Sequence, residues 1–235
     1  MSQLIFMRHG QASFGKENYD ILSELGKKQS LIAARHLLKI KTEFNSAYSG
    51  TLSRQIDTAN LVLEQIKASS NNLSYSQHAG LNEYQYRGII DHYFPILIAN
   101  NPYFKDKKDL IFQDPRTFQL IFDQAIAEWL NAEKVPDGIE SWSEFKHRVT
   151  AAVEQIISEN PKDARILLFS SGGVISTILY LATGMSPYKA FRTGWGLVNA
   201  SFTTFSFTKS GFTLQSFNTY SHLESYHDDK LITYR

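Results

Sequence analysis

The residues best suited to chemistry are Arg8-His9-Gly10-Gln11, which directly follow a short apolar run near the start of the chain. A neutral imidazole is a competent nucleophile toward phosphorus near neutral pH and can carry a phosphoryl group transiently. A neighbouring guanidinium matches phosphoryl oxygens bidentately and stays charged. The sequence has no cysteine, which excludes thiolate nucleophiles, thiolate metal ligands and disulfides. His9 is therefore the candidate nucleophile.

The remaining histidines do not predict a metal site. His36, His92 and His147 fall within expected helices, and none has a histidine or carboxylate partner at a recognisable ligand spacing. Ser171 in Ser170-Ser171-Gly172-Gly173 lacks the preceding glycine of an esterase nucleophile elbow, and the same run is not a dinucleotide fingerprint. We predict chemistry without a metal or another cofactor.

Composition narrows the class of protein further. The 235 residues are 43% hydrophobic and 20% charged, which is typical of a globular chain. Twenty-four basic and 23 acidic residues give a net charge of +1, so nucleic acid is not an expected partner. The start of the sequence shows neither a signal peptide nor an apolar run that could span a membrane. We therefore expect a cytoplasmic protein without membrane contact, and the sequence leaves a homodimer open.

The elements that must position His9 follow an alternating pattern of short apolar runs and amphipathic stretches, typical of an α/β layer fold. Expected strands are Leu4 to Met7, Ser46 to Ser49, Leu73 to Gln77 and Arg165 to Phe169, and an edge hairpin joins Phe202 to Phe207 with Phe212 to Phe217. Expected helices are Ser23 to Lys39, Leu52 to Lys67, Ile90 to Ala99, Arg116 to Leu130, Ser141 to Ser158 and Val174 to Ala182.

Residues 89–135 interrupt this alternation, because two helical pieces follow one another there without a strand. We interpret this stretch as an inserted helical lid over one end of the sheet, whose aromatic residues form its own core. No repeat or linker divides the rest, so residues 1–235 are expected to form a single domain.

Taken together, these features resemble the histidine phosphatase superfamily, also called the phosphoglycerate mutase-like family. Its signature is Arg-His-Gly followed by Glu or Gln at the end of the first strand, as in residues 8–11. The resemblance implies a three-layer α/β/α fold with a mostly parallel central sheet. Further matches follow in chain order: Leu22-Ser23 with Gly26 and Gln29, Ser49 with Arg54, Thr58 and Ala59, Leu81 with Glu83, Gly138-Ile139-Glu140-Ser141, Gly172-Gly173-Val174-Ile175 and Asn199-Ala200-Ser201.

The resemblance also implies the roles of the site residues. His9 becomes the phosphohistidine, Arg8 and Arg54 clamp the phosphoryl oxygens, and Glu83 is the general acid that protonates the leaving oxygen. Gln11, Ser171 and Gly172 complete the expected phosphate-binding set, the last two at the start of a helix whose N–H groups favour an anion.

One position departs from the family pattern. The family has a second histidine in a Ser-His-Gly-Gly setting, where this chain has Ser170-Ser171-Gly172-Gly173. A serine offers one neutral hydroxyl in place of the imidazole. Loss of one preorganised donor costs roughly a hundred- to a thousand-fold in rate, so we expect reduced activity. Arg87, His78 and His222 are the candidates for a compensating basic group, and for His222 structural anchoring is the favoured alternative.

The leading hypothesis is a cofactor-independent phosphatase that acts through phospho-His9 on a small phosphorylated metabolite. The second is a phosphate-binding regulatory protein that lost turnover with the second histidine. Phosphoglycerate mutase is the third, and it is disfavoured because Ala12-Ser13-Phe14-Gly15 replaces the longer mutase signature after residue 11.

Overall fold

A computed structural model describes residues 2–13, 20–67, 73–100 and 114–234. In this part of the chain, six strands form one sheet in the order β3-β2-β4-β1-β5-β6. The first four strands of that order are parallel, whereas β5 pairs antiparallel with β1 and β6 antiparallel with β5. The mostly parallel sheet and the hairpin at its edge are thereby confirmed.

The strands are β1 (Ser2–Arg8), β2 (Ser46–Ser49), β3 (Ser74–Gln77), β4 (Arg165–Ser170), β5 (Phe202–Thr208) and β6 (Gly211–Thr219). The helices are α1 (Glu24–Lys39), α2 (Ser53–Lys67), α3 (Tyr86–Asn100), α4 (Pro115–Asn131), α5 (Trp142–Ser158), α6 (Gly172–Thr183), α7 (Pro187–Gly194) and α8 (Ser221–Glu224). Short 3-10 turns occupy Ala79–Leu81 and Asp229–Leu231.

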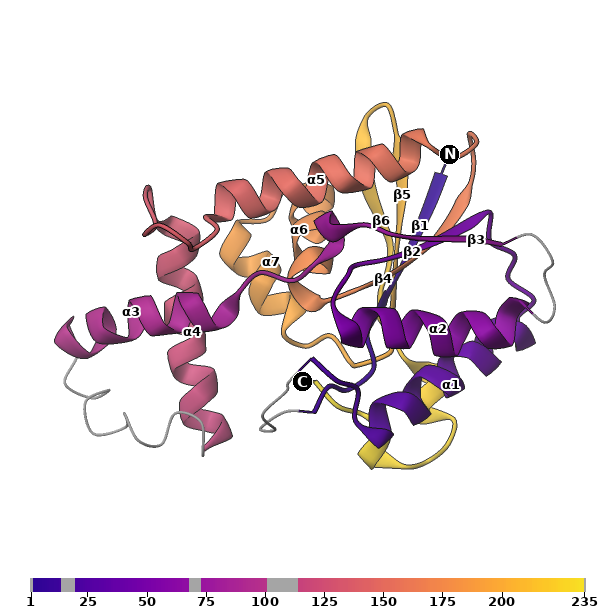
Figure 1. Ribbon diagram of the computed structural model, residues 1–235, viewed down its shortest axis with the longest axis horizontal. Helices are drawn as coiled ribbons and strands as arrows, with labels where there is room; N and C mark the ends of the chain where they lie inside the picture. Colours follow the sequence, from indigo (N-terminus) through magenta and orange to yellow (C-terminus); the bar gives the residue numbers. More distant parts are fainter. Residues whose placement is uncertain (1, 14–19, 68–72, 101–113, 235) are drawn as a thin grey trace.

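Alternation along the strands creates the three layers. On β1, Leu4 and Phe6 join the core beneath α5, α6 and the helices beyond them, whereas Ile5 and Met7 join the core beneath α1 and α2. Figure 1 shows α5 on one side of the sheet and α1 and α2 on the other. Both faces of the central strands are covered, which explains why the run from Leu4 to Met7 is apolar at every position.

Local sequence signals predict the start of some helices but not of others. The helix expected from Ser141 begins with a capping box, in which the Ser141 N–H donates to Glu144 over 2.8 Å. By contrast, α3 begins at Tyr86 rather than Ile90, and α7 was not predicted at all. Ser186 and Pro187 did carry the signal for α7, because a serine cap followed by proline is a common helix start.

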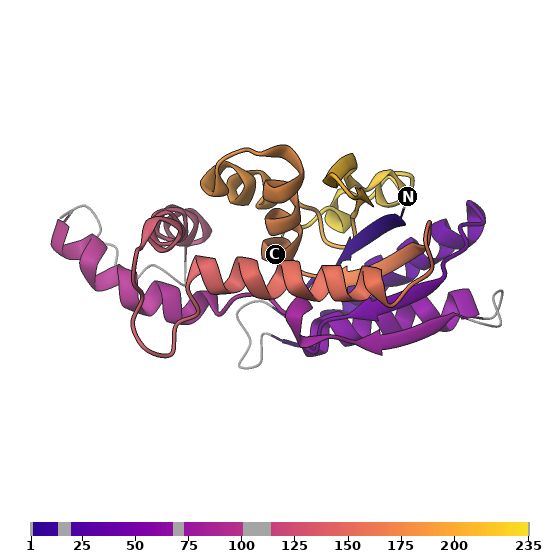
Figure 2. The same cartoon turned by 90° about the horizontal axis from the view of Figure 1, so that it is seen from above.

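Helices α3 and α4 pack on each other at the end of the molecule remote from α1 and α2, as Figure 2 shows. Residues 101–113, which belong to the stretch interpreted as a lid, lie outside the described residues. Their interpretation as part of a lid stays a prediction.

Over the described stretches, no helix is both long and apolar enough to cross a membrane. The same stretches contain no cluster of three or more His, Cys, Asp or Glu residues that could hold a metal ion.

Candidate active site

The two central strands bring their following turns together at one edge of the sheet. Strands β1 and β4 are parallel neighbours with Arg8 opposite Ser170, so His9 and Ser171 emerge side by side. The turn after β1 is tightly packed, because a Cβ at Gly10 would lie 2.3 Å from the Gly26 carbonyl oxygen. Only glycine allows this approach, and the Gly10 N–H then donates to the Thr58 hydroxyl over 3.0 Å.

The imidazole of His9 is fixed in one tautomer. Its Nδ1 lies 2.7 Å from the Gly10 carbonyl oxygen, which can only accept, so Nδ1 carries the proton. Nε2 accepts a hydrogen bond from Arg54 Nε over 3.2 Å. Burial, followed by the charges of Arg54 and Arg8, holds the pKa of His9 well below its usual value, against the opposing bond to Gly10. His9 is therefore neutral, with a lone pair on Nε2.

Arg54 is held at the start of α2 by a residue that sequence reasoning missed. Its Nη1 forms an ion pair with Asp20 Oδ1 over 2.7 Å, and Asp20 Oδ2 accepts the Ser53 N–H over 2.8 Å. The Asp20 carboxylate thus both caps α2 and orients the Arg54 guanidinium. No local pattern around Asp20 predicts this role, since its partners lie more than thirty residues away.

Arg8 is anchored by backbone carbonyls from the far end of the chain. Its Nη1 donates to the Leu197 carbonyl, and its Nη2 donates to the Tyr234 carbonyl over 2.9 Å. The segment that contains Tyr234 is itself tied to the core, because Gln29 donates to the Leu231 carbonyl over 2.8 Å. Two carbonyls therefore fix the Arg8 guanidinium at the base of the site.

Glu83 lines the site next to the turn that follows β4. Its Oε2 accepts the Gly173 N–H over 3.0 Å, and its Oε1 accepts the Tyr84 N–H over 3.2 Å. Burial raises the pKa of Glu83 above its ordinary value, although these bonds and the two arginines oppose the shift. A Cβ on Gly173 would lie 2.1 Å from Glu83 Oε1, so this contact requires glycine. Glu83 thus keeps its proton to a higher pH than an exposed glutamate does.

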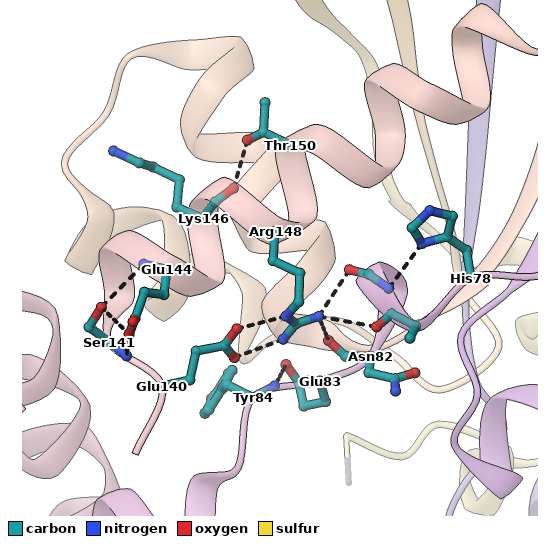
Figure 3. A network of polar contacts seen from close by, with 12 residues as sticks. His78, Asn82, Glu83, Tyr84, Glu140, Ser141, Glu144, Lys146, Arg148 and Thr150 are labelled. Carbon is teal, nitrogen blue, oxygen red and sulfur yellow. Dashed lines mark hydrogen bonds and ion pairs between the residues drawn. The ribbon is translucent and has the colours of Figure 1, made fainter. Parts of the chain in front are cut away.

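The loop before Glu83 is held by a second network that the sequence did not predict (Figure 3). Arg148 on α5 binds Glu140 through Nε over 2.7 Å and through Nη2 over 2.8 Å. Its Nη1 donates to the carbonyls of Gly80 and Asn82 over 3.0 and 3.1 Å. Arg148 therefore fastens the segment that carries Glu83 to the body of the fold.

Ser171 does not line the cavity, in contrast to the expectation. It is fully buried, and its hydroxyl accepts a hydrogen bond from Gln55 Nε2 over 2.8 Å. Gln55 also donates to the Leu81 carbonyl over 3.1 Å. The following residues, Gly172 and Gly173, do line the cavity, so the β4 turn presents backbone there rather than a side chain.

The other predicted residues lie outside the cavity. Gln11 accepts from the Ser23 hydroxyl over 2.8 Å and supports the turn. Arg87 is exposed on α3, and His78 accepts the Gly80 N–H over 3.0 Å. His222 is buried beside the Ala200 carbonyl oxygen at 3.0 Å and stacks on His36. The structure therefore brings none of the proposed compensating groups to the site and places His222 as a structural anchor.

A cavity of about 310 Å³ opens above these groups. The residues that line it are Arg8, His9, Arg54, Glu83, Tyr84, Tyr86, Phe118, Gln119, Phe122, Gly172, Gly173, Ser176, Phe191, Gly194, Trp195 and Tyr234. Of the predicted site residues, His9, Arg8, Arg54, Glu83 and Gly172 thus share one cavity.

Comparison with known proteins agrees with this architecture. The chain belongs to the histidine phosphatase superfamily (branch 1), whose sequence profile matches residues 4–107 and 113–220. A 2,3-bisphosphoglycerate-dependent phosphoglycerate mutase from Streptococcus sanguinis is 39% identical over 70 residues, which are 27% of this chain and 30% of that protein.

Solved structures resemble the chain over nearly its whole length. Phosphoglycerate mutase from Bacillus anthracis gives a TM-score of 0.65 at 20% identity and covers 97% of both chains. A mycobacterial glucosyl-3-phosphoglycerate phosphatase complexed with VO3 gives 0.64 at 22% identity, covering 93% of this chain and 99% of that one. An Entamoeba histolytica phosphoserine phosphatase mutant with phosphoserine gives 0.64 at 21% identity, covering 95% and 100%. These likenesses establish the fold.

Proposed function

We propose that the protein is a phosphomonoester hydrolase that works through a phosphohistidine intermediate on His9. The observation that carries this proposal is the His9 ring, which has its proton on Nδ1 and its Nε2 next to Arg54, in a cavity that Arg8, Arg54 and Glu83 also line. Phosphoryl transfer depends mainly on position and on charge stabilisation, and this arrangement offers both.

In the first step, the Arg54 Nε–H moves from His9 Nε2 to a phosphoryl oxygen, and Nε2 attacks phosphorus. The N–P bond forms while the bond from phosphorus to the leaving oxygen breaks. The protonated Glu83 carboxyl gives its proton to that oxygen, so an alcohol leaves rather than an alkoxide. The Gly10 carbonyl, which accepts from Nδ1–H, stabilises the positive charge that develops on the ring. Arg8 and Arg54 balance the charge on the phosphoryl oxygens.

In the second step, the Glu83 carboxylate takes a proton from water while the water oxygen attacks phosphorus. The N–P bond breaks, phosphate is released, and His9 returns to its neutral form with the proton still on Nδ1. Glu83 ends protonated, so the cycle is closed. Because no second imidazole is proposed in the site, we expect a rate roughly a hundred- to a thousand-fold below that of a site with that donor.

The test is phosphate release from a panel of phosphomonoesters by the purified protein. His9→Ala should abolish release, whereas His147→Ala, which changes an exposed histidine on α5, should retain it. Labelled substrate should also leave an acid-labile phosphoryl group on the unaltered protein and none on His9→Ala. Release that does not exceed the His9→Ala background would contradict the proposal.

The orientation of Ser171 supports a second candidate, a regulatory protein that binds phosphate without turnover. Its hydroxyl is engaged by Gln55 and outside the cavity, so the β4 turn adds no side-chain donor there. Calorimetric binding of inorganic phosphate without hydrolysis of any ester would favour this candidate. Interconversion of phosphoglycerates, measured on the same protein, would instead indicate a mutase, the least supported alternative.

The expectations about the lid, the number of domains, the location and the oligomeric state are also part of the proposal. Phe118, Gln119 and Phe122 of α4 line the cavity, which supports a lid formed within residues 89–135. A single domain, a cytoplasmic location and a homodimer stay predictions.

A further inference from the structure

The cavity above His9 has two chemically different ends. Its floor is formed by the charged groups of Arg8, Arg54 and Glu83 together with His9. The residues above this floor are mainly aromatic. They come from the loop after β3 and the start of α3, from α4, from α7 with the turn beyond it, and from the segment after the 3-10 turn at Asp229–Leu231. These seven aromatic residues are Tyr84, Tyr86, Phe118, Phe122, Phe191, Trp195 and Tyr234.

The aromatic wall is ordered by contacts between its rings. Phe118 and Phe122 lie one turn apart on α4 and stack with centroids 5.7 Å apart at 16°. Phe122 also meets Trp195 at 5.8 Å and Tyr86 at 6.5 Å. Three separate segments thus build one apolar surface, and its rings are positioned before any ligand binds.

The described residues that line the cavity carry their charge at the floor. The positively charged side chains among them are Arg8 and Arg54, and both contact groups at the base. A leaving group with a carboxylate or a second phosphate would place that charge against the aromatic rings. Burial of an unpaired anion in apolar surroundings is strongly unfavourable. The aromatic wall therefore disfavours anionic leaving groups.

Volume sets the size of the ligand, because roughly 150 Å³ of apolar space accommodates a benzene molecule. The 310 Å³ here leaves room for a phosphoryl group and one ring system.

We infer that the substrate is a phosphomonoester whose leaving group is uncharged and contains one aromatic ring system. This inference rests on the proposed hydrolase function and adds the class of substrate. The ring packs against the surface that the α4 aromatic residues form with Trp195, and the phosphoryl group lies on the floor next to His9.

The test compares alkyl phosphates whose leaving oxygens are all primary alcohols, so that intrinsic reactivity is matched. Burial of a phenyl group predicts kcat/KM for 2-phenylethyl phosphate roughly 30- to 100-fold above that for ethyl phosphate. An anionic analogue, 4-phosphooxybutanoate, should fall below butyl phosphate. Equal kcat/KM values across these substrates, or a preference for the anion, would overturn the inference and leave the hydrolase function standing. Absence of His9-dependent release from every ester would instead contradict the hydrolase function.

Single-residue variants then test which side chains cause the preference for an aromatic leaving group. Phe122→Leu should lower the ratio of kcat/KM for 2-phenylethyl phosphate to that for ethyl phosphate by about tenfold. Phe212→Leu, on the edge strand β6, is the matched control and should keep the ratio. An unchanged ratio in Phe122→Leu would overturn the assignment of the wall. Because the substrate series uses the unaltered protein, it decides the main inference even if a variant fails to fold.

Discussion

The turns after β1 and β4 start from neighbouring, parallel strands, yet they contribute differently to the cavity. After β1, the chain presents a side chain, His9, with both ring nitrogens bonded. After β4, the Ser171 side chain turns to Gln55, and the chain presents the backbone of Gly172 and Gly173. The β1 turn therefore supplies the proposed nucleophile, whereas the β4 turn supplies the backbone N–H of Gly173 that binds Glu83.

The two turns also differ in how tightly they are packed. A Cβ at Gly10 would collide with the Gly26 backbone, whereas the nearest atom to a Cβ at Gly172 is 3.9 Å away. The β1 turn is therefore restricted by the backbone of α1, and the β4 turn tolerates a side chain at its first helical residue. Experiments on each turn can test whether this division of roles holds.

The largest effect is expected for Glu83→Gln, which removes the carboxylic acid that is hydrogen-bonded to the β4 turn. General acid catalysis contributes roughly 10² to 10⁴ in rate, so kcat/KM for an alkyl phosphate should fall by that factor. Since burial raises the pKa of Glu83, its acid form persists to higher pH, and activity should decline as pH rises through that pKa. The pH profile of kcat/KM checks this.

Two comparisons sharpen the Glu83 prediction. p-Nitrophenyl phosphate has a leaving group that needs little protonation, so Glu83→Gln should affect it much less than an alkyl ester. Glu154→Gln, an exposed change on α5, should keep the pH profile of the unaltered protein. An alkaline decline that persists in Glu83→Gln would exclude Glu83 as its source.

Ser171→His tests the missing side chain of the β4 turn directly. If an imidazole from this position reaches the phosphoryl group, activity should rise by about 10². Ser171→Ala, which removes the hydroxyl without adding a donor, should show no gain. Steady-state kinetics on one alkyl phosphate measure both variants. The absence of any gain in Ser171→His would count against the idea that Ser171 limits the rate.

Arg148→Met tests whether the support of Glu83 matters. Arg148 holds the carbonyls of Gly80 and Asn82, so its loss should let Glu83 move and lower kcat/KM for alkyl phosphates by about tenfold. Because the effect acts through the acid, p-nitrophenyl phosphate should be affected less. Arg35→Met, an exposed change on α1, is the control. Equal losses on both esters would indicate a general structural defect instead.

Gly10→Ala and Gly172→Ala together test whether the β1 turn is packed more tightly than the β4 turn. A methyl group forced against backbone costs about 3 kcal/mol or more, so Gly10→Ala should lower Tm by roughly 6 °C or more. Gly172→Ala has space and should shift Tm by much less. Thermal unfolding followed by circular dichroism measures both. Similar Tm values for the two variants would remove the distinction between the turns.

His222 lies behind the β1 turn and affects stability rather than chemistry. Burial, with a contribution from His36, lowers the pKa of His222 to about 4, compared with 6.5 when unfolded. The unfolded state therefore binds more protons between these values, and stability falls as pH drops from 6.5 toward 4. From pH 7 to pH 5 this amounts to about 2 kcal/mol. Urea unfolding at both values should show a smaller pH difference for His222→Gln.

Sequence reasoning succeeded where short-range pattern and the family resemblance acted together. The mostly parallel sheet was expected, because strands joined by helices pair in parallel, and Arg8, His9, Arg54 and Glu83 do meet in one cavity. The order of the strands was not predicted. Asp20, Gln55 and Arg148 escaped prediction, since each acts on a partner distant in sequence and none has a local signature. The orientation of Ser171 depends on the Gln55 rotamer, which residue type alone does not determine.

The anchoring of Arg8 has a consequence for the order of synthesis. Arg8 is synthesised well before its partner, because the Tyr234 carbonyl that fixes its Nη2 is made 226 positions later. At about 5 to 20 residues per second, synthesis keeps these two groups apart for ten seconds or more. A nascent chain therefore carries His9 without its complete surroundings, and the finished site assembles only after translation has passed Tyr234.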